Sequence, residues 1–308
     1  MHSHKKRGRY DSGGTGYPNP LKTKALKNNY NSYLVEYELN AVVAAFFGAN
    51  LHFLSADIYL KTASHPAMKA LIVKNTPHEG PGILKPLLER NDIPYDTIDL
   101  DLLDFEAGAA LPDTSHYNAI FVLGGPDSAN DRNSKMLSEL KMIKQAVENG
   151  TPYLGICLGM QVLVKVCSGG VEKNHVKEVG VKGPDGNYFT VNICEGKEDD
   201  PLFRGLAGPL KIFHLHGETV SLPAHLELLA TGKFCRNQIV KAGNNAYGMQ
   251  GHFELTYEMF NEWMVTDPDL KSGDSDQIVR DFCDIHEEYR SNGERLFMNF
   301  LHIAGMIE

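Results

Sequence analysis

From Met68 onward, the sequence alternates continuous apolar runs with amphipathic stretches of helical period, and this alternation constrains the fold more than any other feature. Such apolar runs are typical of strands buried on both faces of a sheet. The predicted strands are residues 68–73 (MKALIV), 95–101 (YDTIDLD), 118–125 (NAIFVLGG) and 152–156 (PYLGI), and the predicted helices are residues 80–93 and 134–150. Strands that alternate with helices indicate a mostly parallel central sheet with helices on both faces.

The second half predicts shorter strands joined by glycine-rich turns, which form a smaller, partly antiparallel element. These strands are residues 187–194, 210–217, 226–232, 238–243 and 246–254. Residues 255–308 form a helical tail, because apolar side chains recur at helical intervals from Ile278 to Ile303. We expect a break between two helices near Asn292 and Gly293. The predicted fold class is α/β, doubly wound, with this antiparallel element and the tail packed on the domain.

The first 67 residues differ in composition from the remainder, so the predicted domain is residues 68–308. The segment carries eight Lys and Arg against four acidic residues, in a chain of formal net charge -9. Its polar, glycine- and proline-rich opening cannot bury a core and is predicted to be largely disordered. An apolar run at residues 41–55 is shorter than the roughly 20 residues of a membrane span. Three interpretations stay open: a tail or a start set too far upstream of Met68, a targeting or anchoring segment, and a docking arm.

Composition also bounds the partners and the compartment. The chain is 42% hydrophobic and acidic overall, which predicts no nucleic-acid partner and no membrane surface. The five cysteines are spread out with no CxxC pair, which argues against a disulfide framework and for a reducing, cytoplasmic compartment. Four of them are expected to be small buried hydrophobes. No GxxxxGK or SGGxDS string is present, so an ATP-using synthetase site is not expected.

The fifth, Cys157, lies in the stretch YLGICLG, between Gly155 and Gly159. A strand is predicted before it and a helix after it, so the cysteine falls on a tight turn with the shape of a nucleophile elbow. The glycines allow neighbouring backbones to approach the turn. The elbow exposes the sulfur at the edge of the sheet, beside a helix N-terminus that favours the thiolate. A structural cysteine needs no such position, whereas a nucleophile does.

A nucleophilic thiolate needs a proton carrier with an orienting group, and a place for the oxyanion. The stretch GMQGHFE supplies His252 and Glu254, which are two residues apart and would share one face of a strand. The stretch VLGGP supplies backbone amides at the end of a neighbouring strand. Together with the amide that follows the nucleophile, these could form an oxyanion hole.

Two further histidines, His214 and His216, occur in the stretch FHLHGETVSLP. A zinc pair is one interpretation, but no third ligand is spaced nearby. A loop that shapes the acceptor side of the site is a second interpretation. A purely structural role is the third.

These stretches resemble the class I glutamine amidotransferases, which carry a Cys-His-Glu triad, and most closely the free-standing, GMP-synthase-like members of that family. The resemblance runs from about Met68 to the C-terminus and is supported by NTPHEGPGIL and GERLFMNFL. It implies a flavodoxin-like fold, no cofactor and no metal. The implied site residues are Cys157, His252 and Glu254 as catalytic groups, Gly125 and Leu158 as oxyanion donors, and Gln161, His216 and Gly217 around the substrate.

The resemblance implies that Cys157 attacks the side-chain amide of glutamine, that His252 protonates the departing ammonia, and that water then releases glutamate. The ammonia would pass to a separate synthase subunit or to water. An alternative is a γ-glutamyl peptidase, because the family has an aromatic residue before the histidine where this chain has Gly251, which could make room for a bulkier amine. A third possibility is a module that senses glutamine without turning it over.

Overall fold

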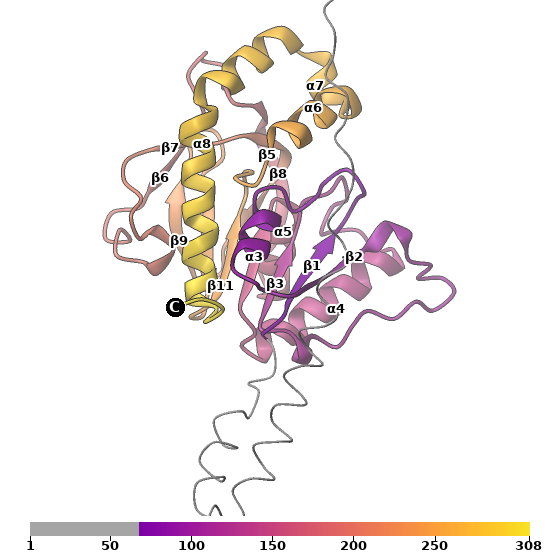
Figure 1. Ribbon diagram of the computed structural model, residues 1–308. Coiled ribbons are helices and arrows are strands. Elements are labelled where there is room, and N and C mark those ends of the chain that lie inside the picture. Colours follow the sequence, from indigo (N-terminus) through magenta and orange to yellow (C-terminus); the bar gives the residue numbers. More distant parts are fainter. Residues whose placement is uncertain (1–67) are drawn as a thin grey trace, which may run out of the picture. The chain divides into compact units, whose positions relative to one another are not determined.

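The computed structural model describes residues 68–308, and the predicted N-terminal extension lies outside the described residues. Within them, a nine-stranded sheet runs in the order β2-β1-β3-β4-β11-β10-β9-β6-β7 (Figure 1). Its first five strands pair in parallel. They are β1 (Ala70–Lys74), β2 (Tyr95–Asp99), β3 (Ala119–Val122), β4 (Tyr153–Ile156) and β11 (Ala246–Met249). The predicted parallel strands before residue 157 are confirmed.

The antiparallel part extends the same sheet beyond β11. It consists of β10 (Ile239–Ala242), β9 (Leu226–Thr231), β6 (Thr190–Ile193) and β7 (Leu210–Lys211). A separate two-stranded sheet pairs β5 (Gly170–Gly180) with β8 (His214–Ser221). Strand β5 was not expected from the sequence, because its residues GVEKNHVKEVG are rich in charges and lack regular alternation.

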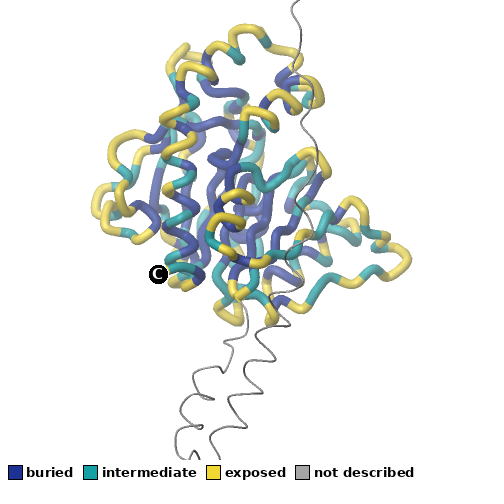
Figure 2. Tube along the Cα trace, viewed as in Figure 1, coloured by how far each residue is buried: buried dark blue, intermediate teal, exposed yellow. Residues whose placement is uncertain are grey.

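Helices cover both faces of the sheet, as predicted, and each face has its own core. On one face, α4 (Ser134–Glu148) and α5 (Leu158–Val166) pack against Leu71, Ile120 and Tyr153. On the other, α3 (Leu84–Arg90) and α8 (Ser275–Ile303) pack against Ile72, Phe121 and Leu154. The alternation of adjacent residues between the two cores follows from the two-residue period of a strand. Figure 2 shows the buried strands between half-exposed helices.

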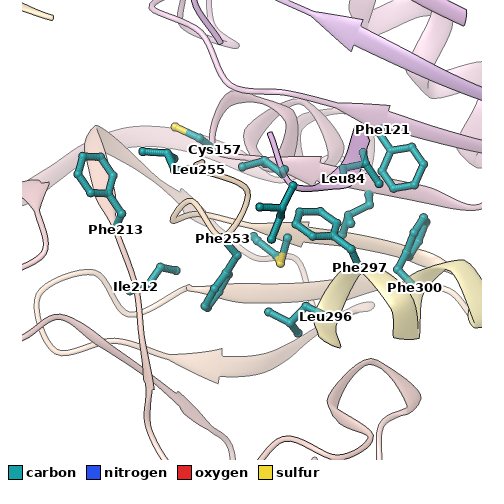
Figure 3. Packing of buried hydrophobic residues seen from close by; sticks show 14 of the residues in the cluster. Leu84, Phe121, Cys157, Ile212, Phe213, Phe253, Leu255, Leu296, Phe297 and Phe300 are labelled. Carbon is teal, nitrogen blue, oxygen red and sulfur yellow. The ribbon is translucent and has the colours of Figure 1, made fainter. Parts of the chain in front are cut away.

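The C-terminal tail contains α6 (Tyr257–Thr266), α7 (Pro268–Ser272) and α8, and α8 is continuous. The predicted break near Asn292 and Gly293 is therefore wrong. Gly293 lies inside the helix, where a Cβ atom would come within 2.3 Å of the carbonyl oxygen of Phe253. The glycine allows α8 to pack closely on the turn that follows β11, and Figure 3 shows Leu296 and Phe297 of this helix near Phe253.

Short 3-10 turns complete the described chain at Leu100–Leu102, Thr114–His116 and Pro201–Phe203. No helix within residues 68–308 is both long and apolar enough to cross a membrane. All five cysteines are free. Of the four cysteines expected to be buried, Cys235 is buried, Cys167 and Cys194 are half-buried and Cys283 is exposed, so the expectation is confirmed for Cys235 alone.

Candidate active site

Cys157 lies on the turn between β4 and α5, as the sequence predicts. Its backbone has φ 52° and ψ −105°, a conformation that costs a non-glycine residue about 1–3 kcal/mol and is typical of functional sites. The turn is held on both sides, since Cys157 N–H donates to the Met249 carbonyl at 2.7 Å and Gln161 N–H donates to the Cys157 carbonyl at 3.2 Å. The sulfur thus lies at the carboxyl edge of the parallel strands, where ligands bind in sheets of this kind.

The two flanking glycines are required by contacts across the elbow. A Cβ atom on Gly155 would lie 2.4 Å from the carbonyl carbon and oxygen of Gly159, and a Cβ on Gly159 would lie 2.2 Å from the carbonyl oxygen of Val122. Tyr153 also donates its hydroxyl to the Gly159 carbonyl at 2.7 Å. Any larger residue at either glycine would displace the cysteine.

His252 and Glu254 follow β11 and do not belong to it, because β11 ends at Met249. The prediction that both lie on one strand is wrong. His252 N–H instead donates to the Phe213 carbonyl at 2.8 Å, which anchors the turn to the chain before β8. The two side chains meet nevertheless: Nδ1 of His252 lies 2.7 Å from Oε1 of Glu254, and both residues are buried.

Helix α8 holds this turn through Tyr289. The hydroxyl of Tyr289 donates to the His252 carbonyl at 2.9 Å and accepts from Leu255 N–H at 3.1 Å. One buried side chain of the tail therefore fixes the backbone on both sides of Glu254.

Charge couples the histidine to both of its partners. Burial opposes a charge on the imidazole, but Glu254 and the Cys157 sulfur outweigh it and raise the pKa of His252 well above its usual value. Because Cys157 and Glu254 both raise this pKa, the three side chains form one interacting group. Trp263 packs against the imidazole with the two ring planes nearly perpendicular and the centroids 4.9 Å apart. This arrangement can hold a thiolate beside an imidazolium, as a nucleophile and its acid–base partner require.

Gly124 and Gly125, at the end of β3, lie next to the elbow because β3 pairs with β4. A Cβ on Gly125 would come within 3.3 Å of the Leu158 side chain and 2.6 Å of Asn75 Cβ. The two residues predicted as oxyanion donors are therefore neighbours. Asn75 was not found from the sequence. Its side-chain amide donates to the Leu123 carbonyl at 3.3 Å and to Glu139 at 3.1 Å, which fixes the end of β3.

Gln161 is buried in the first turn of α5 and contacts a second glutamine. Its Nε2 lies 3.4 Å from Oε1 of Gln250, and Nε2 of Gln250 lies 3.8 Å from the Cys157 sulfur. The role of Gln161 in holding substrate stays a prediction. Gln250 was missed, although it stands two residues before His252 in the stretch GMQGHFE.

His214 and His216 lie on strand β8, so the interpretation as a loop is wrong for them, while Gly217 is a half-buried residue of the same strand. Glu178 of β5 is paired in register with His216, and their side chains are 2.9 Å apart. The three donor groups lie within 4.8 Å of one another. Two imidazoles and a carboxylate are a donor set that zinc and iron sites use. Sequence spacing missed Glu178 because it comes from another strand.

Gly251 does not provide room for a substrate. A Cβ atom at this position would lie 2.4 Å from Ile212 and 2.6 Å from the His214 ring. The space that an aromatic residue would fill is therefore already occupied by this protein's own side chains, and the expectation that Gly251 makes room for a bulkier amine is wrong.

The loop between β1 and α3 also reaches the site. Gly82 has φ 49°, and a Cβ there would lie 1.8 Å from the carbonyl oxygen of Glu254. Ile83 N–H donates to the same oxygen at 2.8 Å. Glu79 of this loop lies against Gly124, close to His252. No local sequence pattern predicts these contacts, because they join segments far apart in the chain.

Solved structures share this fold. A glutamine amidotransferase from Thermotoga maritima is similar with a TM-score of 0.66 and 20% identity, covering 77% of this chain and 98% of that chain. A glutamine amidotransferase from Methylobacillus flagellatus is similar with a TM-score of 0.66 and 24% identity, covering 76% and 94%. The fold is thus that of class I amidotransferases, with a mostly parallel sheet, a small antiparallel sheet and a C-terminal helix.

Sequence comparison identifies the family to which this chain belongs. The model of the class I glutamine amidotransferases matches residues 88–267, and this chain belongs to that family. The glutamine amidotransferase-like protein YfeJ of Salmonella typhimurium is 27% identical over 208 residues, covering 64% of this chain and 84% of YfeJ. A subunit of the glutamine-hydrolysing GMP synthase of Sulfolobus acidocaldarius is 32% identical over 166 residues, covering 52% of this chain and 81% of that subunit. The resemblance found in the sequence is confirmed.

Proposed function

We propose that this protein hydrolyses the side-chain amide of glutamine through a thioester on Cys157. The sulfur attacks the amide carbon, and His252 gives its proton to the nitrogen as the C–N bond breaks, which releases ammonia. Water, deprotonated by the same histidine, then attacks the thioester and releases glutamate and the free thiol. Glu254 orients the imidazole and stabilises its positive form.

The observation that carries this proposal is the interaction of a strained elbow cysteine with a histidine that a buried carboxylate holds at 2.7 Å. A glutamine sensor without turnover needs no such group. The backbone amides of Gly125 and Leu158 are the proposed oxyanion donors, each worth about 2.7–4 kcal/mol in comparable sites. Gln161, His216 and Gly217 are the proposed substrate neighbours.

We infer that the ammonia acceptor is a separate synthase subunit. The relative from Sulfolobus acidocaldarius is itself one subunit of a GMP synthase, and the present chain has no nucleotide-binding fingerprint of its own. We place the protein in the reducing cytoplasm, because the mechanism requires a free thiol and all five cysteines are free.

The test compares glutamate release by the wild type, Cys157→Ala and the matched control Cys283→Ala, whose cysteine is exposed on α8. We expect Cys157→Ala to lose at least about 10³-fold in turnover with an unchanged circular dichroism spectrum, and the control to retain it. Each protein is assayed alone and with any partner recovered by pull-down from native lysate. Undiminished turnover by Cys157→Ala would rule out the mechanism.

A further inference from the structure

A small pocket opens beside the His252–Glu254 pair. Its volume is about 140 Å³, and its walls include Glu79, Pro126, Leu215, Trp263 and Asp267. A water molecule occupies about 30 Å³ of liquid, so the pocket has room for ammonia or for an amine of a few heavy atoms.

The walls of this pocket contact the reacting groups of the proposed mechanism. The carbonyl oxygen of Leu215 lies 4.0 Å from the Cys157 sulfur. Trp263 packs against the imidazole of His252 with the ring planes nearly perpendicular. Pro126 directly follows Gly125, the proposed oxyanion donor. The pocket therefore adjoins the site on the side of the histidine.

Glu79 supplies the chemical character of this pocket. Its Oε2 atom is buried and has no hydrogen-bond partner among the described residues. Both this oxygen and the His252 ring lie against Gly124: a Cβ there would be 2.1 Å from Glu79 Oε2 and 3.1 Å from His252 Cε1. An unsatisfied buried carboxyl oxygen is costly. Because Glu79 is only half-buried and lines the pocket, a turn of its side chain would pair the carboxyl group with an N–H group or a cation there.

The charges around Glu79 set when it is ionised. Burial raises the pKa of Glu79 to about 7, with His252 and His78 acting against the rise and Glu254 and Asp267 adding to it. The carboxyl group can therefore exchange a proton near neutral pH.

The position of His252 decides which part of a substrate meets this carboxyl group. His252 must face the amide nitrogen, because it gives that nitrogen its proton. A pocket on the side of His252 therefore receives the departing amine. The glutamyl part of the substrate binds outside this pocket.

We propose that this pocket is the subsite for the leaving amine and that Glu79 recognises that amine, so that amides of ammonia and of small neutral or cationic amines are favoured over amides whose amine carries a carboxylate. This inference rests on the proposed function. In the step itself the C–N bond breaks, the nitrogen takes the proton of His252, and the free amine then takes a second proton from the Glu79 carboxyl group or from water. The resulting ammonium ion is paired with the Glu79 carboxylate.

The test uses two γ-glutamyl substrates that have the same number of heavy atoms and differ in charge: γ-glutamylglycine, whose leaving amine carries a carboxylate, and γ-glutamylglycinamide, whose leaving amine does not. We expect the wild type at pH 8 to show a kcat/KM at least tenfold higher for the glycinamide. In Glu79→Gln this ratio should fall toward one. The matched control is Glu287→Gln, which removes an exposed carboxylate of α8 that does not line the pocket and should keep the wild-type ratio.

A second measurement needs no variant. The ratio of the two kcat/KM values in the wild type should fall as the pH is lowered through about 7, because Glu79 loses its charge there while the glycine carboxylate keeps its own. Effects on the triad cancel in the ratio. A wild-type ratio near one at every pH, or a Glu79→Gln ratio equal to that of the wild type, would overturn the subsite. Failure of the wild type to release glutamate from glutamine and from both γ-glutamyl compounds would instead overturn the proposed function itself.

Discussion

Replacing Gly293 by alanine tests whether helix α8 positions the catalytic turn. In an ordinary helix interior, Gly→Ala gains about 1 kcal/mol of stability. Here the new Cβ would lie 2.3 Å from the Phe253 carbonyl oxygen and 2.7 Å from Ile83 Cδ1. A normal contact requires about 1 Å more than the first distance, so the helix or the turn must move. Overpacking of this kind costs about 1–3 kcal/mol.

The contact is with backbone that cannot rotate away, so we take the upper part of that range and expect Gly293→Ala to lower the free energy of unfolding by about 1–2 kcal/mol net. The moved residue, Phe253, stands between His252 and Glu254. A displacement near 1 Å in a catalytic group can cost about 10²-fold. We therefore expect glutamine turnover to fall at least tenfold.

The assay measures urea unfolding and glutamate release for the wild type, Gly293→Ala and the control Ser291→Ala, an exposed position of the same helix. The control should change the free energy of unfolding and the turnover little. A helix broken at Gly293 would give the opposite sign, because alanine would only favour helix formation. Higher stability of Gly293→Ala with unchanged turnover would refute the role of α8 proposed here.

Two further variants test the buried carboxyl groups of Glu254, in the site, and Glu139, below the end of β3. Glu254→Gln should lower the pKa of His252, since the carboxylate raises it. We therefore expect turnover to drop about 10²–10⁴-fold and the high-pH limb of the pH–rate profile to move to lower pH. An unshifted pH–rate profile would contradict this role of Glu254. Glu139 is buried, and burial raises its pKa to about 7 from 4.5, so its contribution to stability is complete below pH 4.5 and is lost as the pH rises to 7. Glu139→Gln should therefore gain about 2 kcal/mol relative to the wild type between pH 5 and pH 8 in urea unfolding, and a difference independent of pH would exclude a raised pKa.

Much of the fold follows from local sequence, and the exceptions have a common cause. Strands β1, β3 and β4 are continuous apolar runs that have to be buried on both faces wherever they pair. Strand β5 is polar, and its partner β8 begins 34 residues after β5 ends. The residues of β5 alone do not indicate that it pairs with β8. Gly293 predicts a helix break when only its neighbours in the sequence are considered. The contact that requires a glycine there is with Phe253, which lies 40 residues away in the sequence.

The candidate site shows the same division. The elbow at Cys157 is encoded within five residues, and the structure confirms both the turn and the reason for its glycines. The pairing of His252 with Glu254 was expected from the alternation of a strand, yet a turn produces it. Because His252 and Glu254 are only two residues apart, their pairing is predicted from the sequence even though the predicted strand conformation is wrong.

Contacts from distant segments explain why the rest of the site was not visible, and they also explain how the triad is held. The carbonyl group of His252 accepts from Tyr289 of α8, and that of Glu254 accepts from Ile83 at the start of α3. The same β1–α3 loop carries Glu79 into the pocket beside His252. A displacement of this loop should therefore alter both the orientation of the acid–base pair and the preference for the leaving amine. This coupling predicts that variants at Gly82, where a Cβ would overlap the Glu254 carbonyl, change turnover and the ratio of charged to neutral substrates together, whereas Glu79→Gln changes the ratio more than the turnover of glutamine.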